Sequence, residues 1–204
     1  MSYDDSYEKD NKAHGPFYRL GEAIQKSLDE IVAKNGIEKS VLLIGRYNFD
    51  GKNLSKLSEF FYWSNNKIKS VKYPTLNITF MTAHASKGLG RDNVIIINAK
   101  DDTLGFPSKI EDDPVMKLVI NDEESMDYEE ERRLFYVALT RTKNRIYIIS
   151  PQNKPSKFIT EIQRDFKNVV LSGAPLQPKD LGNTNIGARY AITHFKKEVQ
   201  ILNF

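Results

Sequence analysis

Cysteine is absent from this chain of 204 residues, and histidine occurs only three times. The lack of cysteine excludes disulfides, thiol nucleophiles and thiolate zinc sites, and the scattered histidines show no metal-ligand spacing. We therefore predict no metal site built from this chain alone. Long apolar runs are also missing, because no stretch approaches the roughly eighteen residues of a membrane-spanning helix. The charged N-terminal residues lack the apolar core of a secretory signal, so we expect a cytoplasmic protein that does not insert into membranes.

An excess of either charge is also lacking. Thirty lysines and arginines face 27 acidic residues, a net charge of +3, which excludes a uniformly basic shell of the kind that coats DNA. The charge is uneven, however, since residues 101–131 contain twelve acidic residues and two lysines. We therefore expect any nucleic-acid contact to be a local patch away from this acidic segment. The solvated charged surface of an ordinary globular protein is the alternative explanation.

What the sequence does contain is a globular pattern, with 40% hydrophobic residues and alternating helix and strand signals from residue 16 to residue 170. We expect a flexible tail at residues 1–15 and a tail or small extension at residues 171–204. Apolar residues three and four apart predict a first helix that stops at Gly36. Continuous apolar runs predict buried strands at Val41–Ile44, Val94–Ile97 and Ile146–Ile149, and a further strand is expected at Ile78–Thr82.

Further helices are predicted at Asn53–Trp63, Asp127–Thr142 and Pro155–Phe166, with a short possible strand at Ile68–Tyr73. Apolar strands that alternate with helices are typical of an open, mostly parallel α/β sheet with helices on both faces. In such sheets ligands usually bind beyond the carboxyl ends of the strands. The loops that follow the predicted strands are therefore the places to look for a site.

One such loop, Thr82–Gly90, combines hydroxyl side chains, Lys87 and two glycines. This composition can present backbone N–H groups and a cation to a phosphate, although a glycine turn with a solvated lysine would look the same. His84 could donate to a phosphate or serve a structural role. The Gly-x-x-x-x-Gly-Lys-[Ser/Thr] spacing of a phosphate-binding P-loop occurs nowhere in the chain.

Arginines stand at two further positions of interest. Arg141 continues the spacing of Leu134, Val137 and Ala138 on the predicted Asp127–Thr142 helix, so it extends an apolar stripe. It either meets an anionic partner there or caps the last carbonyls of the helix. Arg132 and Arg133, which follow Glu129–Glu131, are predicted to form a surface ion-pair network.

Arg46 and Asn48 directly follow the first predicted strand, so we expect them at the same edge of the sheet as the Lys87 loop. Contact with phosphate and local turn hydrogen bonding are both open. The aromatic residues of Phe60–Trp63 could stack on bases or could belong to the core.

Two of these stretches together resemble a known family. Thr79–Leu89 (TFMTAHASKGL) resembles motif V, and Glu130–Lys143 (EERRLFYVALTRTK) resembles motif VI, of the UvrD/Rep-type superfamily 1 DNA helicases. Val41–Asn48 is similar to the strand and Arg-x-Asn element that precede motif V in that family. The resemblance covers roughly residues 37–167 and implies a RecA-like fold, that of the second of two motor domains.

The resemblance also implies partners, a cofactor and site residues. It implies ATP with Mg²⁺, held mainly by an N-terminal RecA-like domain that is not in this chain, and a single-stranded DNA track. Arg141 would be the arginine finger that neutralises charge at the γ-phosphate. The implied contacts are, for ATP, Gly88, Gly90 and Arg141, and, for DNA, Arg46, Asn48, Thr82, His84, Ser86 and Lys87.

Three features depart from many members of the family. Gly90 stands where many relatives carry a glutamate that meets the nucleotide sugar, and a glycine there resembles a helicase IV-like subgroup. About thirty residues separate Asn48 from motif V, too few for a large accessory domain. The Walker A lysine, the Walker B acids and the first arginine finger have no counterpart, so the isolated chain is expected to be inactive.

These departures leave alternatives open. The chain is either a fragment of a longer helicase or a natural remnant. A non-catalytic module that binds nucleic acid or a partner, as a helicase remnant or as part of a helicase-nuclease, is the alternative function. An unrelated nucleotide-binding α/β domain is a further alternative.

Overall fold

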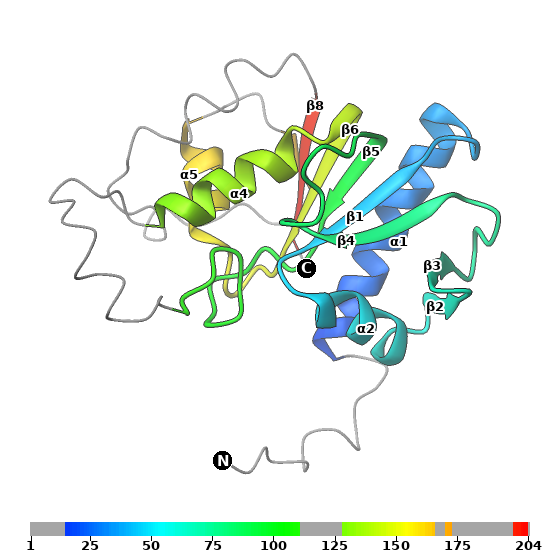
Figure 1. Cartoon of the computed structure of the whole chain (residues 1–204), viewed down its shortest axis with the longest axis horizontal. Helices are drawn as coiled ribbons and strands as arrows, with labels where there is room; N and C mark the ends of the chain where they lie inside the picture. Colours follow the sequence, from blue (N-terminus) through cyan, green and yellow to red (C-terminus); the bar gives the residue numbers. More distant parts are fainter. Residues whose placement is uncertain (1–14, 111–127, 166–169, 173–197, 204) are drawn as a thin grey trace, which may run out of the picture.

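The computed structural model describes residues 15–110, 128–165, 170–172 and 198–203. Their helices and strands are, in chain order, α1 (Pro16–Asn35), β1 (Val41–Gly45), α2 (Asn48–Leu57), β2 (Phe61–Ser64), β3 (Lys67–Ser70), β4 (Ile78–Thr82), β5 (Arg91–Ile96), α4 (Glu129–Leu139), β6 (Thr142–Ser150), α5 (Lys157–Asp165), β7 (Val170–Ser172) and β8 (Glu198–Asn203). Six strands form one sheet in the order β4-β1-β5-β6-β8-β7, and β2 pairs with β3 in a separate hairpin. Every pairing in the large sheet is parallel. The predicted open, parallel α/β fold of the RecA-like kind is confirmed (Figure 1).

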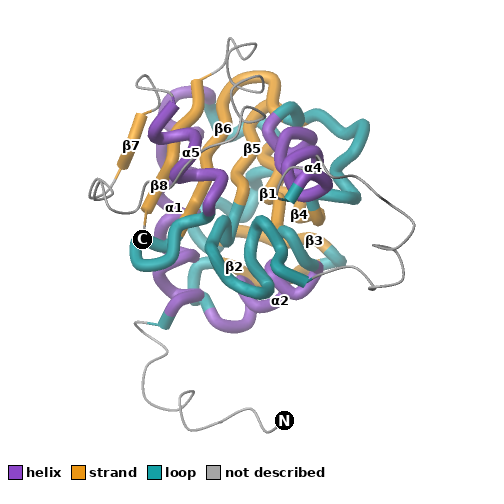
Figure 2. Tube along the Cα trace, turned by 90° about the vertical axis from the view of Figure 1, so that its left-hand side faces the viewer, coloured by secondary structure: helices purple, strands orange, loops and turns teal. Residues whose placement is uncertain are grey.

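Helices cover both faces of the sheet, because alternate residues of each buried strand point to opposite sides. On one side, Leu42, Val94 and Ile146 pack with α4 and α5. On the other, Val41, Ile95 and Tyr147 pack with α1 and α2. Figure 2 views the molecule from the α4–α5 side, with these helices in front of the strands. The continuous apolar runs in the sequence thus correspond to strands that are buried on both faces.

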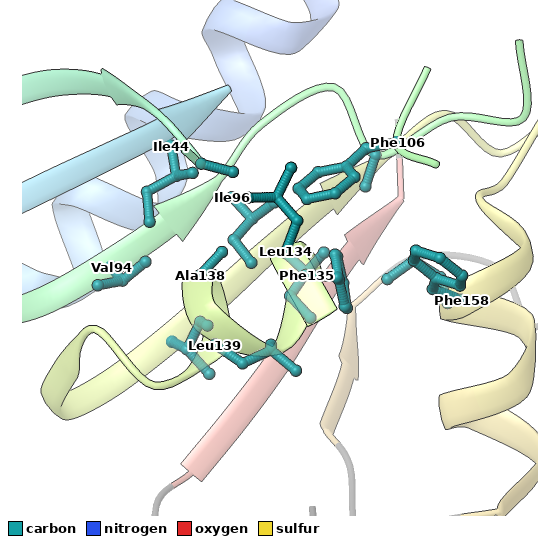
Figure 3. Close-up of a cluster of buried hydrophobic side chains, with 14 of the residues drawn as sticks. Ile44, Val94, Ile96, Phe106, Leu134, Phe135, Ala138, Leu139 and Phe158 are labelled. Atoms are coloured by element: carbon teal, nitrogen blue, oxygen red, sulfur yellow. The ribbon is translucent and has the colours of Figure 1, made fainter. Parts of the chain in front are cut away.

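The core under α4 determines where this helix lies. Leu134, Phe135, Ala138 and Leu139 are buried against the sheet (Figure 3). The ring of Phe135 lies 5.1 Å from that of Phe106 and 5.2 Å from that of Phe158, measured between centroids. Burying a side chain of this size stabilises the fold by about 1.5–3 kcal/mol. The packing fixes α4 across the sheet and so positions the residues at both of its ends.

One helix end agrees closely with its sequence signal, and another does not. Helix α1 ends at Asn35, and Gly36 follows with φ of 85°, its N–H donating to the carbonyl of Val32 at 3.0 Å. Only glycine adopts this conformation at little cost, which explains the stop. Helix α4 is shorter than predicted, since it ends at Leu139. Lys143, the last residue of the stretch that resembles motif VI, lies in β6.

The prediction of a helix over Asn53–Trp63 is only partly right. Helix α2 runs from Asn48 to Leu57, and the chain then turns into the hairpin strand β2 at Phe61. The aromatic and β-branched residues of this stretch favour an extended strand, a signal that we assigned to a helix. The possible strand at Ile68–Tyr73 corresponds to β3.

The C-terminal strand β8 belongs to the main sheet. Residues 198–203 pair in parallel with β6 on one side and with β7 on the other. This differs from the predicted boundary at residue 170, because part of the segment assigned to a tail extends the sheet. The acidic residues 111–127 and the predicted tail at 1–15, apart from Gly15, lie outside the described residues.

None of the helices in the described ranges combines the length and the apolar content that crossing a membrane requires.

Candidate functional site

The predicted site residues fall into two groups at opposite edges of the sheet. Strands β1 and β4 are parallel and end at Gly45 and Thr82, so Arg46 and His84 lie together at the carboxyl edge. Arg141 lies at the amino edge, where its carbonyl accepts a hydrogen bond of 3.0 Å from the N–H of Arg91, the first residue of β5. Helix α4 joins the two edges.

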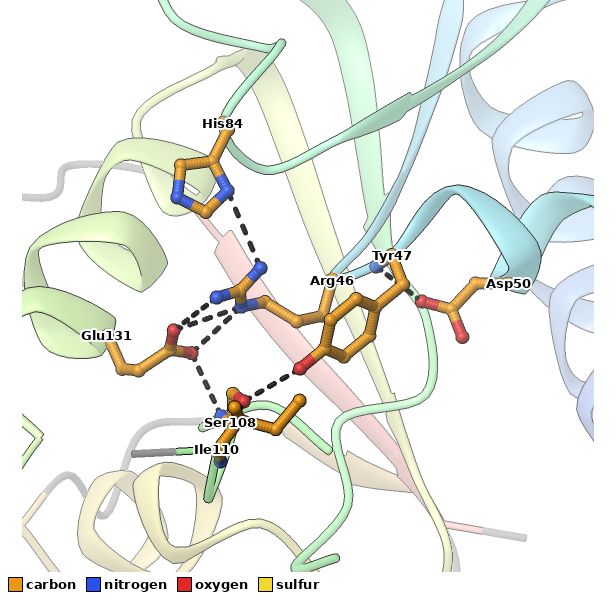
Figure 4. A network of polar contacts seen from close by, with 7 residues as sticks. All are labelled: Arg46, Tyr47, Asp50, His84, Ser108, Ile110 and Glu131. Carbon is orange, nitrogen blue, oxygen red and sulfur yellow. Dashed lines mark hydrogen bonds and ion pairs between the residues drawn. The ribbon is translucent and has the colours of Figure 1, made fainter. Parts of the chain in front are cut away.

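At the carboxyl edge, Arg46 is clamped by Glu131 from the first turn of α4 (Figure 4). Its Nε donates to both carboxylate oxygens at 3.0 Å, and its Nη2 lies 2.6 Å from Oε1. The side chains are 17% and 13% exposed, so water screens the pair only in part. Desolvation lowers the pKa of Arg46, but the hydrogen bonds and charge of Glu131 outweigh it and raise that pKa above its ordinary value.

Glu131 also fixes the loop after β5. Its Oε2 accepts the N–H of Ser108 at 2.9 Å. The hydroxyl groups of Tyr47 and Ser108 are 2.7 Å apart, and the Arg46 guanidinium lies 4.9 Å from the centre of the Tyr47 ring. Three segments that are distant in sequence therefore meet around one ion pair.

Asp50 supports the turn that carries Arg46. Its carboxylate accepts the N–H of Tyr47 and the Nδ2 of Asn98, both at 2.9 Å. Burial raises the pKa of Asp50, and these hydrogen bonds offset that effect only in part. Asn48, the other residue of the Arg-x-Asn element, begins α2 with its side chain exposed.

His84 reaches the same cluster from the loop after β4. Its Nδ1 lies 3.5 Å from Nη1 of Arg46. A guanidinium can only donate, so Nδ1 would be the acceptor in this contact. His84, Arg46 and Glu131 thus form a line across the carboxyl edge (Figure 4).

The remaining loop residues have different surroundings. The Thr82 hydroxyl accepts the N–H of Ala85 at 3.3 Å. Ser86 is fully buried and donates to the carbonyl of Ala83 at 2.7 Å, so its side chain holds the loop from within. Lys87 is exposed, and Gly88 has φ of 82°, a conformation that favours glycine. Of this loop, His84 and Lys87 face outward as charged or titratable groups.

At the amino edge, Arg141 is half-buried and bonds to uncharged oxygens. Its Nε donates to the carbonyl of Val137 and its Nη2 to the hydroxyl of Thr140, both at 2.9 Å. Within the described residues it has no acidic partner. Gly90 lies beside it, since a Cβ there would be 3.7 Å from the Arg141 carbonyl oxygen. The structure therefore brings Gly90 and Arg141 together, away from Arg46.

The sequence did not reveal the role of Arg132. Its guanidinium forms an ion pair with Glu161 of α5, with Nη2 2.8 Å from Oε1, and the side chains are 11% and 4% exposed. It also lies 4.9 Å from the centre of the Phe158 ring. The predicted surface network is therefore wrong for Arg132, though it holds for Arg133, which pairs with Glu129 while 70% exposed. The spacing could have indicated that Arg132 faces inward, because it precedes the buried Phe135 and Leu139 by three and seven residues and so lies on their face of the helix.

Among the described residues, no group of three or more histidine or acidic side chains is arranged to hold a metal ion.

Comparison with known proteins identifies a family and several relatives of this chain. Residues 16–153 match the family of UvrD-like helicase C-terminal domains. The chain is 32% identical to DNA helicase IV of Escherichia coli K12 over 133 residues, which is 65% of this chain and 18% of that protein. It is 35% identical over 98 residues to a probable DNA helicase II homolog of Mycoplasma capricolum, which is 43% of this chain and 12% of that protein.

A third relative is the ATP-dependent DNA helicase PcrA of Leuconostoc citreum, 29% identical over 106 residues, 47% of this chain and 13% of that protein. No solved structure matches the chain. The matched segments span less than a fifth of the length of these relatives. Because the family match covers most of the chain and includes both candidate edges, the chain belongs to the UvrD-like helicase C-terminal domain family.

Proposed function

We propose that this chain is the second motor domain of an ATP-dependent DNA helicase, with a nucleotide-facing edge at Arg141 and a DNA-facing edge at Arg46. The observation that carries the proposal is the separation of the two predicted residue groups to opposite edges, joined by the rigidly packed α4. A motor must respond to nucleotide and to DNA at different surfaces. Helix α4 begins beside Arg46 at one edge and ends beside Arg141 at the other, so it connects the two surfaces.

At the nucleotide-facing edge, Arg141 would act as an arginine finger. Its planar, permanently charged fork matches phosphate oxygens. Its present partners, Val137 and Thr140, are uncharged, so the guanidinium keeps its net charge for an anion. Exchanging neutral acceptors for a phosphate would strengthen its hydrogen bonds, since charge-assisted bonds are about twice as strong as neutral ones.

ATP and Mg²⁺ would be held mainly by the other motor domain, which is not part of this chain. The residues here fit a complementary role: a cation with neutral partners, beside Gly90, whose missing side chain leaves space near Arg141. Gly88 and Gly90 would allow the backbone to approach the nucleotide. When bound, Mg²⁺ would neutralise charge on the β- and γ-phosphates, and the task of this chain would be to present Arg141.

At the DNA-facing edge, His84 and Lys87 are exposed, and Arg46 lies behind them. Asn48 and Thr82 complete the edge, whereas buried Ser86 would act by shaping the loop. Glu131 neutralises Arg46 in this structure, so a DNA phosphate would have to compete with a carboxylate. We therefore assign the first contact with single-stranded DNA to Lys87 and His84.

The test of the nucleotide-facing edge is Arg141→Lys in the longer helicase with both motor domains. Lysine keeps the charge but loses the fork, so kcat for ATP should fall about 10³-fold. The unfolding midpoint and DNA affinity of the variant should stay close to those of the parent. Turnover near the parent value in the Lys variant would contradict the finger.

The test of the DNA-facing edge uses the 204-residue chain itself. Lys87→Ala should flatten the slope of log affinity against log salt for single-stranded DNA by about 0.7, the contribution of one phosphate. The same chain should show no steady ATP turnover with or without DNA. Robust DNA-stimulated hydrolysis by the pure chain would contradict the division of the ATP site.

A non-catalytic binding module is the second candidate, favoured by one observation. The contacts of Arg141 with Val137 and Thr140 are those of a structural helix cap. In that case Arg141→Ala would lower the free energy of unfolding by about 1 kcal/mol, and turnover in the longer protein would not depend on this residue.

A further inference from the structure

The β2–β3 hairpin presents a polar and aromatic face to solvent. Its strands are antiparallel, with Tyr62 opposite Lys69 and Ser64 opposite Lys67. Residues directly opposite one another in such a pair share a face, so these four side chains form one surface, which we call the outer hairpin face. Tyr62, Ser64 and Lys67 are exposed and Lys69 is half-buried.

The hairpin is firmly anchored. On its inner face Phe61 and Ile68 are 2% and 0% exposed and pack into the α1–α2 core. The turn residues Asn65 and Asn66 have φ of 50° and 58°, as a two-residue type I′ turn requires. Anchoring and a tight turn hold the outer hairpin face in one geometry, so a ligand there would pay little ordering entropy.

Two large aromatic side chains of β2 are left in contact with water. Tyr62 is 40% exposed and Trp63 is 41% exposed. Tyr62 belongs to the outer hairpin face, whereas Trp63, which pairs with Ile68, lies on the other face of the hairpin. Exposed aromatic side chains beside lysines are the combination that single-stranded nucleic acid uses, with bases stacked on rings and phosphates paired with cations.

The charge around the hairpin supports an anionic ligand. From Phe60 to Arg91 the chain contains no aspartate or glutamate, and its cations are Lys67, Lys69, Lys72, Lys87 and Arg91. Lys72 is paired with Asp29 of α1 at 2.9 Å. By contrast, neither Lys67 nor Lys69 forms an ion pair with any residue in the described part of the chain. The two lysines of the outer hairpin face are therefore available to phosphates.

We propose that the outer hairpin face is a second nucleic-acid contact, in which Lys67 and Lys69 pair with phosphates of a single strand and Tyr62 stacks on a base. This site is distinct from the carboxyl edge, because it uses none of Arg46, His84 and Lys87. The hairpin packs beside β4, the strand that leads to the His84 loop (Figure 1). The site would lengthen the track along which this domain holds a strand.

The first experiment is a salt titration of oligothymidylate binding to the 204-residue chain. Lys67→Gln combined with Lys69→Gln should reduce the log–log salt slope by about 1.4, or about 0.7 for each phosphate. The matched control is Lys52→Gln combined with Lys56→Gln, which removes the same charge from exposed positions of α2 and should leave the slope close to that of the parent. Equal slopes in the two double variants would overturn the proposal.

The second experiment tests the stacking role of Tyr62. Tyr62→Ala should weaken oligothymidylate binding about ten-fold and Tyr62→Phe should restore it, because the stacking ring returns. Binding of heparin, a polyanion without bases, should be the same in Tyr62→Ala as in the parent. Equal weakening of heparin binding, or failure of Tyr62→Phe to rescue, would overturn the stacking role. If Lys87→Ala leaves the salt slope unchanged while the hairpin lysine variants still reduce it, the carboxyl-edge assignment is contradicted and the hairpin site stands.

Discussion

The two ends of α4 hold their arginines in different ways. At the carboxyl edge, Glu131 of the first turn binds Arg46 with a full opposite charge at 2.6 Å. At the amino edge, Arg141 follows the last turn and bonds to a carbonyl and a hydroxyl. A carboxylate competes strongly with an incoming phosphate, whereas neutral oxygens do not. The comparison shows that Arg46 is already neutralised by a carboxylate, whereas Arg141 has uncharged partners.

The packing of α4 relates these two edges. The buried pair of Arg132 and Glu161 fastens α4 to α5, and the apolar stripe fastens it to the sheet. Glu131, Arg132 and Arg141 contact different partners. Changes at these three residues should therefore have separable effects.

The largest effect is expected from Arg132→Ala, which breaks the attachment of α4 to α5. Glu161 would be left buried without its partner, and breaking such a pair costs about 3–5 kcal/mol. Urea unfolding of the 204-residue chain measures this loss. Arg133→Ala, an exposed neighbour on the same helix, is the control and should change the free energy of unfolding by less than about 0.5 kcal/mol. Similar losses in both variants would contradict the anchoring role.

A smaller effect is expected when the clamp at the carboxyl edge is opened. Glu131→Gln keeps the shape of the side chain but no longer neutralises Arg46, so Arg46 becomes available to DNA. The salt slope for single-stranded DNA should steepen by about 0.7, the value for one added phosphate contact.

The control for the clamp is Glu130→Gln, which removes the same charge from a side chain that is 74% exposed. It should leave the slope near that of the parent. If both variants steepen the slope equally, general charge rather than the clamp determines DNA binding.

A pH effect at the amino edge sharpens the comparison further. The N–H and hydroxyl of Ser40 donate to Asp92 at 2.9 and 2.7 Å and lower its pKa. A lowered pKa in the folded state means that this stability is present above the unfolded pKa and is lost as pH falls through the folded value. Asp92→Asn should cost about 1 kcal/mol at neutral pH and make the acid limb of stability shallower, as measured by urea unfolding across acidic pH. An unchanged acid limb would contradict the role of Asp92.

The opposite sign is expected at the carboxyl edge, where burial raises the pKa of Asp50. A raised pKa in the folded state means that its contribution is full below the unfolded pKa and declines as pH rises through the folded value. Asp50→Asn should remove this decline while losing one of two hydrogen bonds, a cost of about 1 kcal/mol. Urea unfolding at pH values below the unfolded pKa and above the folded pKa of Asp50 tests this prediction. If stability still declines with pH in the Asn variant, another group is responsible.

The sequence predicted most of the fold, because strand and helix patterns are local properties. Apolar runs located β1, β5 and β6, a strand was also expected at β4, and helix signals located α1, α4 and α5. It placed Arg46 and His84 at one edge because both follow parallel strands. It missed β2, where an aromatic stretch was assigned to a helix, and it missed the sheet position of β8, because pairing with β6 depends on a return of the chain that no local pattern encodes.

The site divides in the same way between local and long-range information. The sequence by itself determined the parallel α/β architecture and the residues that resemble helicase motifs, since both depend on neighbours along the chain. Only the tertiary structure decided which partner each cation takes: Arg46 meets Glu131, and Arg132 turns inward to Glu161. Ion pairs between segments depend on how the chain brings distant residues within a few ångströms, and charge patterns along a sequence carry no record of that distance.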